Sequence, residues 1–170
     1  MGCVEYQSLI RSSDLNMCSF DGRFRVRLGS HQLKTLLALC RESGPVETGG
    51  LLIGKYNAAH DTALVTRVWG PPKDSIRKRT SFRRGTHGLQ SQLDSLWRTT
   101  QEYYLGEWHF HPEGAAQPSK SDIRQMVRIA KSLQYNTPEP LLIIVGGSKW
   151  EVVTHIFPRC HQPIKLDTST

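Results

Sequence analysis

The stretch Gly106-Glu107-Trp108-His109-Phe110-His111-Pro112 says most about the fold and chemistry of this chain. Alternate residues of a β-strand point to the same face, so His109 and His111 are predicted to aim both imidazole rings at one point. Trp108 and Phe110 are then predicted to pack on the opposite face. Asp122 follows after a short loop and adds a carboxylate. Two imidazoles and one carboxylate form the ligand set of a catalytic zinc site with a fourth position left for water, which predicts one Zn²⁺ per chain.

Length and composition indicate one folded domain. The chain has 170 residues, 38% of them hydrophobic, which suits one core better than two. The longest apolar run, Leu141–Val145, is far shorter than the ~20 residues that span a bilayer. The first residues lack the apolar segment of a secretory signal peptide. We therefore expect a cytoplasmic protein with no membrane partner.

The hydrophobic pattern predicts alternating strands and helices. Strands are expected over residues 24–28, 46–56, 63–69, 103–111, 141–145 and 152–157, with a short one over 81–83. Helices are expected from Ser30, as N-cap, to about residue 42, and over about 88–100 and 121–133. This order predicts a single α/β or α+β domain with a mixed β-sheet flanked by helices. We place the domain at residues 22–158, between an N-terminal extension (1–21) and a polar, loose C-terminal tail (159–170).

Much of the positive charge lies in one stretch. The formal net charge is +7, and residues 73–84 contain Lys73, Arg77, Lys78, Arg79, Arg83 and Arg84. A basic patch can bind nucleic acid. Single strands are bound through several stacking aromatic residues, however, and this stretch contains only Phe82. Nucleic acid is therefore not the expected partner, and the stretch is interpreted as a solvated loop or as a dock for an acidic protein.

The segment from Ser119 to Asp122 supports two interpretations. Its spacing predicts a capping box, in which Ser119 caps a helix and Asp122 is the third helical residue. A single carboxylate is not expected to serve fully both as a cap and as a metal ligand. With the two histidines at this distance, we favour Asp122 as a ligand. Ser119 either only caps the helix or donates its hydroxyl proton to the oxyanion that forms when water attacks a carbonyl.

Glu47 is the candidate general base. Water activated at a metal needs a nearby carboxylate to take its proton and return it to the leaving amine. Glu47 stands at the start of an otherwise apolar strand, where an unpartnered charge is unfavourable. Glu107 is a rival, because it shares a strand face with His109 and His111. Glu107 is alternatively a group that orients a ligand histidine.

Taken together, these residues resemble the motif of the JAMM, or MPN-type, metalloprotease family. That motif has an upstream glutamate, here Glu47 before Thr48-Gly49-Gly50, then H-x-H-P, and then a serine and an aspartate, here Ser119 and Asp122. The resemblance covers residues 22–158. It implies a cytidine-deaminase-like layering, zinc held by His109, His111 and Asp122, Glu47 as acid and base, and Ser119 as oxyanion support. One departure is Phe110, where the family usually has a small hydroxylated residue.

The compact chain resembles bacterial members of this family. Glu107-Trp108-His109 is similar to deconjugating peptidases of antiphage (CBASS) operons, which release a cyclic-nucleotide synthase (a CD-NTase) from its conjugates. The resemblance implies hydrolysis of the amide bond after the C-terminal residue of a conjugated CD-NTase or ubiquitin-like protein. It also makes residues 73–84 the expected dock for that target. The alternatives are a peptidase that processes a sulfur-carrier protein and a non-catalytic binding scaffold.

Overall fold

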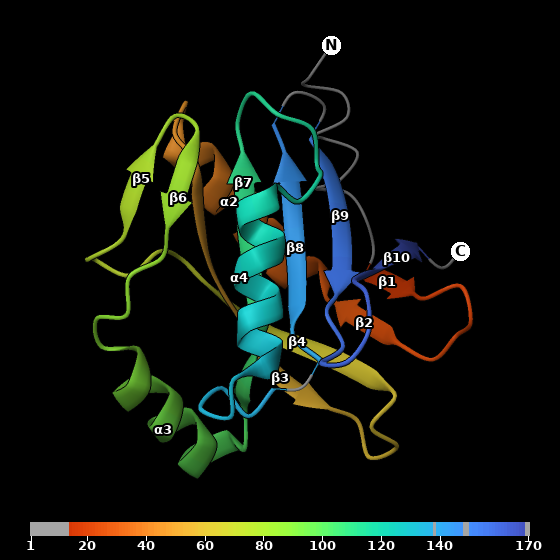
Figure 1. The fold of residues 1–170 in the computed structure, drawn as a ribbon. Coiled ribbons are helices and arrows are strands. Elements are labelled where there is room, and N and C mark those ends of the chain that lie inside the picture. The colour runs from red at the N-terminus through yellow and green to blue at the C-terminus, as the bar shows by residue number, and fades with distance from the viewer. Residues whose placement is uncertain (1–13, 138, 148–149, 169–170) are drawn as a thin grey trace.

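Eight of the described strands form a closed barrel (Figure 1). The computed structural model describes residues 14–137, 139–147 and 150–168. Around the barrel the strands are β1 (Leu15–Cys18), β10 (Ile164–Thr168), β9 (Glu151–Ile156), β8 (Leu141–Gly146), β7 (Tyr103–His111), β3 (Thr48–Tyr56), β4 (Thr62–Trp69) and β2 (Arg25–Leu28). β7 pairs with β8 and β2 pairs with β4 in parallel, and the other neighbours are antiparallel. The sheet is therefore mixed, as the sequence predicts.

Helices pack against two sides of this sheet. α2 (Ser30–Ser43) places Leu33, Leu36 and Leu37 in one core, whereas α4 (Lys120–Lys131) places Met126 and Ile129 in a second core. In Figure 1, α4 lies in front of β7 and β8, and α2 lies behind the sheet. Together with α3 (Leu89–Thr100), these elements make a mixed α+β domain.

The alternation predicted for the histidine strand is confirmed. In β7, Trp108 and Phe110 belong to the core that α2 covers, and both are buried. His109 and His111 point to the other side, where both contact Asp122 of α4. The apolar residues of β7 thus fix the strand against the barrel core while its polar residues face the first turn of α4. Phe110 points away from the site, so its size does not obstruct the histidines.

The helix that begins at Ser30 is not capped as predicted. Gly29 is the N-cap of α2, and its lack of a side chain leaves no cap hydrogen bond at that position. Ser30 is instead the first helical residue. Its backbone N–H donates to Asp14 Oδ1 at 3.1 Å, so a carboxylate from the segment before β1 satisfies this free donor of the first turn.

The polar C-terminal tail was predicted to be loose, and this prediction is wrong. Residues Ile164–Thr168 form β10, which pairs with β9 on one side and β1 on the other. Leu166 points into the barrel core and is 3% exposed. A single buried leucine in a polar segment is a weak sequence signal, and the pairing with β1 involves residues from the other end of the described chain.

None of the described helices is long and apolar enough to cross a membrane. The expectation that no export signal is present concerns residues 1–13, which lie outside the described part of the chain.

Candidate metal centre

His109, His111 and Asp122 come together at the end of β7 and the start of α4. One ligand atom from each residue lies within 4.8 Å of the others. Asp122 Oδ1 lies 2.9 Å from His109 Nδ1, and Asp122 Oδ2 lies 3.6 Å from His111 Nε2. His109 and Asp122 are buried, whereas His111 is half-buried. The group is therefore shielded on the side of His109 and opens toward solvent at His111.

Gly49 makes room for the His109 ring. In the β3–β7 register, Gly49 lies opposite His109. A Cβ atom at position 49 would lie 2.4 Å from the carbonyl oxygen of Trp108 and 2.8 Å from His109 Cδ2, both shorter than real contacts allow. The glycine pair that follows Glu47-Thr48 in the sequence thus permits the close approach of β3 to the histidine strand.

Asp122 closes the capping box and contacts both histidines at once. Its Oδ2 accepts a hydrogen bond from the Ser119 backbone N–H at 2.7 Å, while the Ser119 hydroxyl accepts one from the Asp122 N–H at 3.2 Å. Its Oδ1 faces His109. One carboxylate thus closes the capping box and also faces both histidines, so the geometry is compatible with both interpretations of Asp122.

Opposite charges shift the pKa values of Asp122 and His109 in opposite directions. Burial alone would raise the pKa of Asp122, but hydrogen bonds from His109 and His111 outweigh it and keep that pKa far below its usual range. Burial alone would lower the pKa of His109, but hydrogen bonds to Asp122 and Glu107 raise it to about 9. Two imidazoles and one carboxylate so arranged fit a divalent cation of the zinc type, which would take the place of the protons.

Glu47 lies directly before β3 and is half-buried. Its backbone N–H donates to the carbonyl oxygen of Lys78 at 2.8 Å. Burial raises the pKa of its carboxyl, and the charges of His111 and Asp122 act on it in opposite directions. Glu47 is thus within electrostatic reach of the metal centre, accessible to solvent, and shifted toward the pKa range in which a carboxylate exchanges protons.

Ser119 is exposed at the N-terminus of α4. Its oxygen accepts the bond from Asp122, and it lies 2.8 Å from the Ser121 hydroxyl. Accepting a cap bond leaves the hydroxyl proton free to donate elsewhere. Both interpretations of Ser119, as cap and as donor to an oxyanion, are thus geometrically compatible.

A two-stranded hairpin contacts the metal centre, and only one of its strands was predicted from the sequence. β6 (Ser81–Arg83) was predicted, whereas its partner β5 (Ile76–Lys78) was not, because no apolar alternation marks it. The Phe82 ring packs edge-on against His109, with ring centroids 5.4 Å apart. A lone aromatic residue within a basic stretch was the available signal for this contact.

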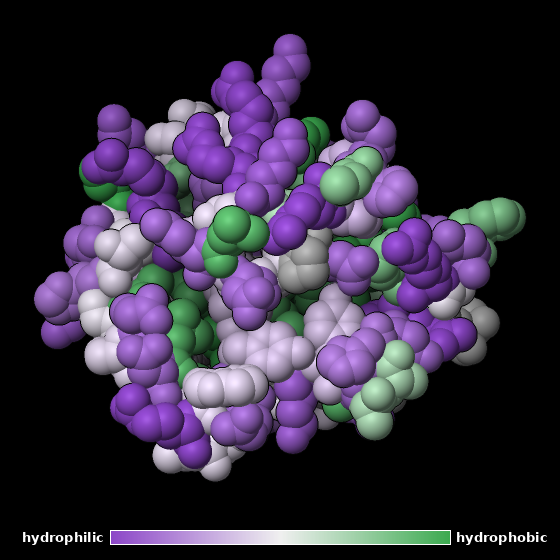
Figure 2. Space-filling view, turned by 60° about the horizontal axis from the view of Figure 1, so that its bottom comes forward, coloured by the Kyte–Doolittle hydropathy of each residue, from purple (hydrophilic) through white to green (hydrophobic). Residues whose placement is uncertain are grey.

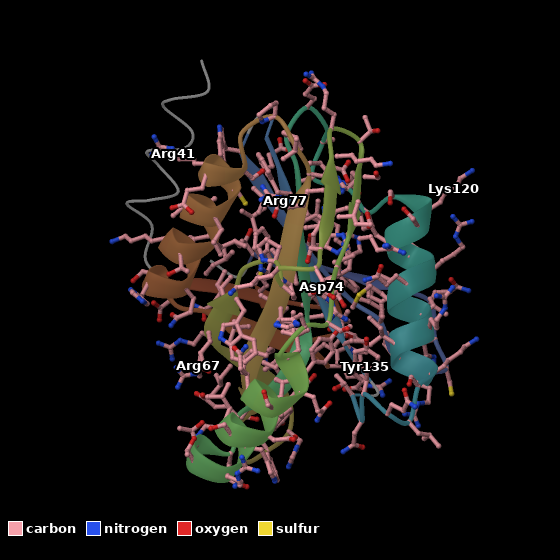
Figure 3. The ribbon with its side chains drawn as sticks, turned by 90° about the vertical axis from the view of Figure 1, so that its left-hand side faces the viewer. Arg41, Arg67, Asp74, Arg77, Lys120 and Tyr135 are labelled. Atoms are coloured by element: carbon pink, nitrogen blue, oxygen red, sulfur yellow. The ribbon has the colours of Figure 1, made fainter. Side chains whose placement is uncertain are left out.

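The basic residues of this hairpin fall into two groups. Most are exposed, and Figure 3, turned toward this side, shows Arg77 on the hairpin. Arg79 forms an ion pair with Glu113, in the loop after β7. Arg84 is different, because its side chain is only 7% exposed and forms an ion pair with the buried Glu107. The stretch is thus a solvated basic surface that ends in one buried cation.

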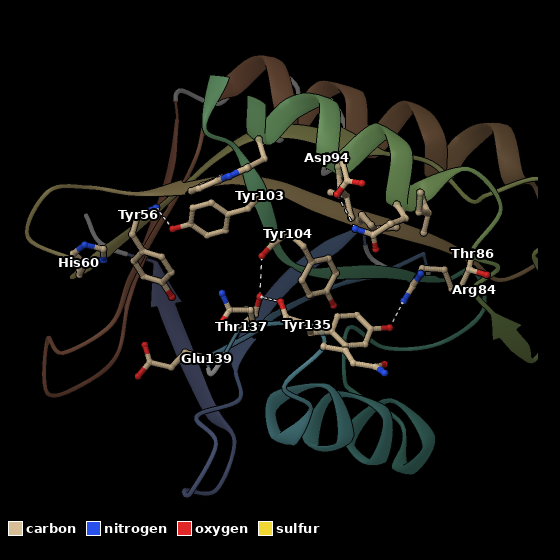
Figure 4. A pocket seen from close by; sticks show the side chains of 17 residues that line it. Tyr56, His60, Arg84, Thr86, Asp94, Tyr103, Tyr104, Tyr135, Thr137 and Glu139 are labelled. Atoms are coloured by element: carbon tan, nitrogen blue, oxygen red, sulfur yellow. Dashed lines mark hydrogen bonds between the residues drawn. The ribbon is translucent and has the colours of Figure 1, made fainter. Parts of the chain in front are cut away.

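A cavity of about 780 Å³ lies between α3, β7 and the loop after α4 (Figure 4), and its lining includes none of the candidate metal ligands. Its wall includes five aromatic side chains, namely Tyr56, Trp97, Tyr103, Tyr104 and Tyr135. Arg84 forms the wall nearest Glu107 and donates to the Tyr135 hydroxyl at 3.0 Å. In Figure 2, hydrophobic side chains are visible in hollows of a face that is mostly hydrophilic.

Comparison with known proteins agrees with this geometry. Residues 30–157 match a family model described as prokaryotic homologs of the JAB domain. The chain belongs to this family. The JAB domain thus contains α2, the metal centre and strands β3 to β9, and the resemblance noted in the sequence is confirmed.

Two curated relatives have informative names. A "CD-NTase/cGAS isopeptidase" of Enterobacter hormaechei subsp. hoffmannii (strain UCI 50) is 36% identical over 163 residues, which cover 94% of this chain and 90% of the relative. A "Probable metalloprotease y4qB" of Sinorhizobium fredii is 30% identical over 113 residues, covering 65% and 68% of the two chains. These names support a hydrolase of the peptidase class.

A solved structure supports the fold. The solution structure of protein DSY2949 from Desulfitobacterium hafniense superposes with a TM-score of 0.53 at 23% identity. The match covers 82% of this chain and 86% of that one. The similarity therefore extends over most of the domain.

Proposed function

We propose that this JAB domain is a zinc-dependent isopeptidase that removes a conjugated protein from its target by hydrolysing the amide bond after the C-terminal residue of that protein. The observation that carries the proposal is the grouping of His109, His111 and Asp122 beside a half-buried Glu47 whose pKa is raised by burial. The ligand group can hold one zinc ion, and the glutamate can move a proton. Metal peptidases require both functions.

His109, His111 and Asp122 would hold the metal. When bound, zinc supplies Lewis-acid chemistry that makes water a competent nucleophile near neutral pH. Glu47 takes the proton from the attacking water and returns it to the departing amine, which its raised pKa favours. Ser119 donates its free hydroxyl proton to the oxygen of the scissile carbonyl as negative charge develops there. The Phe82 ring shields His109 from solvent on the hairpin side.

The substrate we propose is the C-terminal tail of a conjugated CD-NTase, as in an antiphage system, with the tail of a ubiquitin-like protein as the alternative. The name of the Enterobacter relative, which aligns over almost the whole chain, supports the first choice. The exposed basic side chains of the β5–β6 hairpin are the proposed dock for the body of the conjugate. Nucleic acid is not proposed as a partner.

Finer points of the fold and setting are also proposals. The packing of α2 and α4 on different sides of the sheet supports a cytidine-deaminase-like layering. We retain residues 22–158 as the metallopeptidase unit, to which β1 and β10 add barrel strands from either side.

A cytoplasmic location is proposed because the CD-NTase conjugates would be found there.

Cleavage of a panel of conjugates tests the proposal. The panel contains a CD-NTase tail, a ubiquitin-like tail and a sulfur-carrier protein with an extra C-terminal residue, each tagged beyond the scissile bond. We expect cleavage of the CD-NTase tail with zinc present and none after chelation. Cleavage of the sulfur carrier alone would show the same peptidase chemistry with a sulfur-carrier protein as the substrate. Zinc binding without cleavage of any of the three would favour a binding scaffold and contradict the isopeptidase proposal.

A further inference from the structure

Glu107 is the most enclosed charged residue near the metal centre. It precedes His109 by two positions on the same face of β7, and it is completely buried. Its Oε1 accepts a hydrogen bond from Arg84 Nε at 2.9 Å and lies 3.4 Å from the Tyr104 hydroxyl. Its Oε2 accepts one from Gln125 Nε2 at 2.7 Å and lies 3.4 Å from His109 Nε2. Residues from β7, α4 and the segment after β6 thus fix this carboxylate in place.

This environment does not suit proton exchange with a substrate. A general base must come within hydrogen-bond reach of the proton that it removes. Both oxygens of Glu107 are engaged by neighbouring side chains, and the residue has no exposed surface. Glu47 is half-buried and open to solvent. Of the two carboxylates considered as the general base, Glu107 therefore cannot reach a substrate or water, whereas Glu47 can.

Arg84 makes the buried charge of Glu107 tolerable. A buried carboxylate is strongly unfavourable unless it is paired and hydrogen-bonded. The Arg84 guanidinium supplies the opposite charge and is itself held by the Gly85 carbonyl oxygen, at 3.1 Å, and by the Tyr135 hydroxyl (Figure 4). The pair joins the end of the hairpin segment to the strand that carries both histidines.

The His109 ring lies between two carboxylates. Its Nδ1 faces Asp122 at 2.9 Å, and its Nε2 faces Glu107 at 3.4 Å. A carboxylate opposite the second ring nitrogen of a ligand histidine fixes the orientation of the ring and strengthens the ligating nitrogen as a donor. We propose that Glu107, held by Arg84, is a positioning residue that orients His109 for metal binding. The inference rests on the proposed function only in requiring a metal at this centre.

Zinc affinity of the full-length chain tests this role directly. Affinity is measured by competition with a chromogenic chelator for the wild type, Glu107→Gln and Glu102→Gln. The last is a matched control, because Glu102 immediately precedes β7 and is paired with Arg67 at 2.7 Å, on the α3 side. We expect Glu107→Gln to bind zinc about 10- to 100-fold more weakly and Glu102→Gln to match the wild type. Equal affinity in all three proteins would overturn the proposal.

A second variant guards against a folding defect. Glu107→Gln leaves Arg84 buried without its counter-charge, so the double variant Arg84→Met/Glu107→Gln removes both charges together. If only the double variant folds, weaker zinc binding by it supports the proposal, and wild-type affinity overturns it. The visible absorption spectrum of bound Co²⁺ gives an independent readout, because a reoriented ligand changes the spectrum and a loss of stability alone does not. We expect a shift for Glu107→Gln and none for Glu102→Gln.

The same experiment separates this inference from the proposed function. A wild-type chain that binds no zinc would overturn the metal centre itself, and with it the proposed isopeptidase. A wild-type chain that binds zinc and cleaves its substrate, together with a Glu107→Gln variant of unchanged affinity and Co²⁺ spectrum, would overturn only the positioning role.

Discussion

Asp122 connects the helix start to the metal centre through its two carboxylate oxygens. Oδ2 accepts the backbone N–H of Ser119, and Oδ1 contacts His109. The first turn of α4 therefore forms in the position at which its carboxylate meets the histidines of β7. The capping box thus also holds the Asp122 carboxylate against His109, which explains why one sequence pattern supported two interpretations.

Two substitutions separate the contribution of Asp122 to metal binding from the contribution of Ser119 to helix capping. Loss of a residue that only orients a ligand weakens metal binding by ~10- to 100-fold. Asp122→Asn removes the charge of a proposed ligand itself, so we expect it to weaken zinc binding by more than that. Ser119→Ala removes the cap acceptor and the proposed oxyanion donor but no proposed metal ligand, so we expect it to lower the free energy of unfolding by about 1 kcal/mol and to leave zinc affinity unchanged. Metal analysis and urea denaturation measure the two effects. Full zinc content in Asp122→Asn would return Asp122 to a purely capping role.

The raised pKa of His109 predicts how the metal-free protein responds to pH. This pKa is about 9 in the folded chain, against 6.5 as its ordinary value. Protonated His109 therefore contributes stability that is fully present below about pH 6.5 and is lost as pH rises through about 9. The difference corresponds to a few kcal/mol, on the order of 3. Zinc would replace the proton, so its affinity should rise with pH over the same interval.

Urea unfolding across this pH range, with and without a chelator, tests that account. The chelated protein should lose stability between about pH 6.5 and 9, and the zinc-loaded protein should lose less. Asp122→Asn is the control, since it removes the main partner that raises the pKa and should flatten the chelated profile. A chelated wild-type protein of constant stability would contradict the pairing of His109 with Asp122.

The β5–β6 hairpin lies against the metal centre. It contacts the metal centre through Phe82, and Glu47 bonds to the Lys78 carbonyl. Its outer surface carries exposed cations, among them Arg77 and Arg83. One short element thus combines an inner apolar contact with an outer charged surface, which suits a substrate dock beside a catalytic group.

Charge reversal tests this dock. Arg77→Glu/Arg83→Glu should raise KM for the conjugate by about tenfold, with a smaller effect at high salt, and should leave zinc content and kcat nearly unchanged. Lys34→Glu/Lys55→Glu is the matched control, because both lysines are exposed and lie in other elements, α2 and β3. Equal KM for the two double variants would remove the hairpin from substrate binding.

Closure of the barrel depends on the two ends of the described chain. β1 and β10 pair with each other, and Leu166 of β10 reaches the core. The strands that carry the metal centre, β3 and β7, lie on the opposite side of the barrel order. The terminal strands therefore contribute to stability through the common core and lie away from the site.

Leu166→Ala measures this contribution. Removing a buried leucine side chain should lower the free energy of unfolding by about 2–5 kcal/mol. Lys165→Ala, one residue earlier and exposed, should change it by less than about 0.5 kcal/mol. Urea denaturation compares them with the wild type. Equal stability of both variants would mean that β10 does not close the barrel.

Sequence patterns revealed the parts of this molecule that depend on local periodicity. The alternation in β7 predicted the faces of Trp108 and His109, and the spacing to Asp122 predicted that the three candidate ligands lie together. β10 and the Arg84–Glu107 pair were missed, because β10 pairs with β1 at the other end of the described chain as well as with β9, and Arg84 and Glu107 come from separate elements. Nothing local distinguishes Arg84 from the solvated arginines beside it; only the fold brings it to a buried carboxylate.

The central claim, that Glu47 moves the proton at a zinc site formed by His109, His111 and Asp122, is tested most directly by one comparison. Wild type and Glu47→Gln are each loaded with zinc, their metal content is measured, and their rates of conjugate cleavage are compared. We predict equal zinc content and a turnover that is ~10²- to 10⁴-fold lower in Glu47→Gln, because general-base catalysis is lost and no ligand is. Cleavage by Glu47→Gln at the wild-type rate would contradict the account.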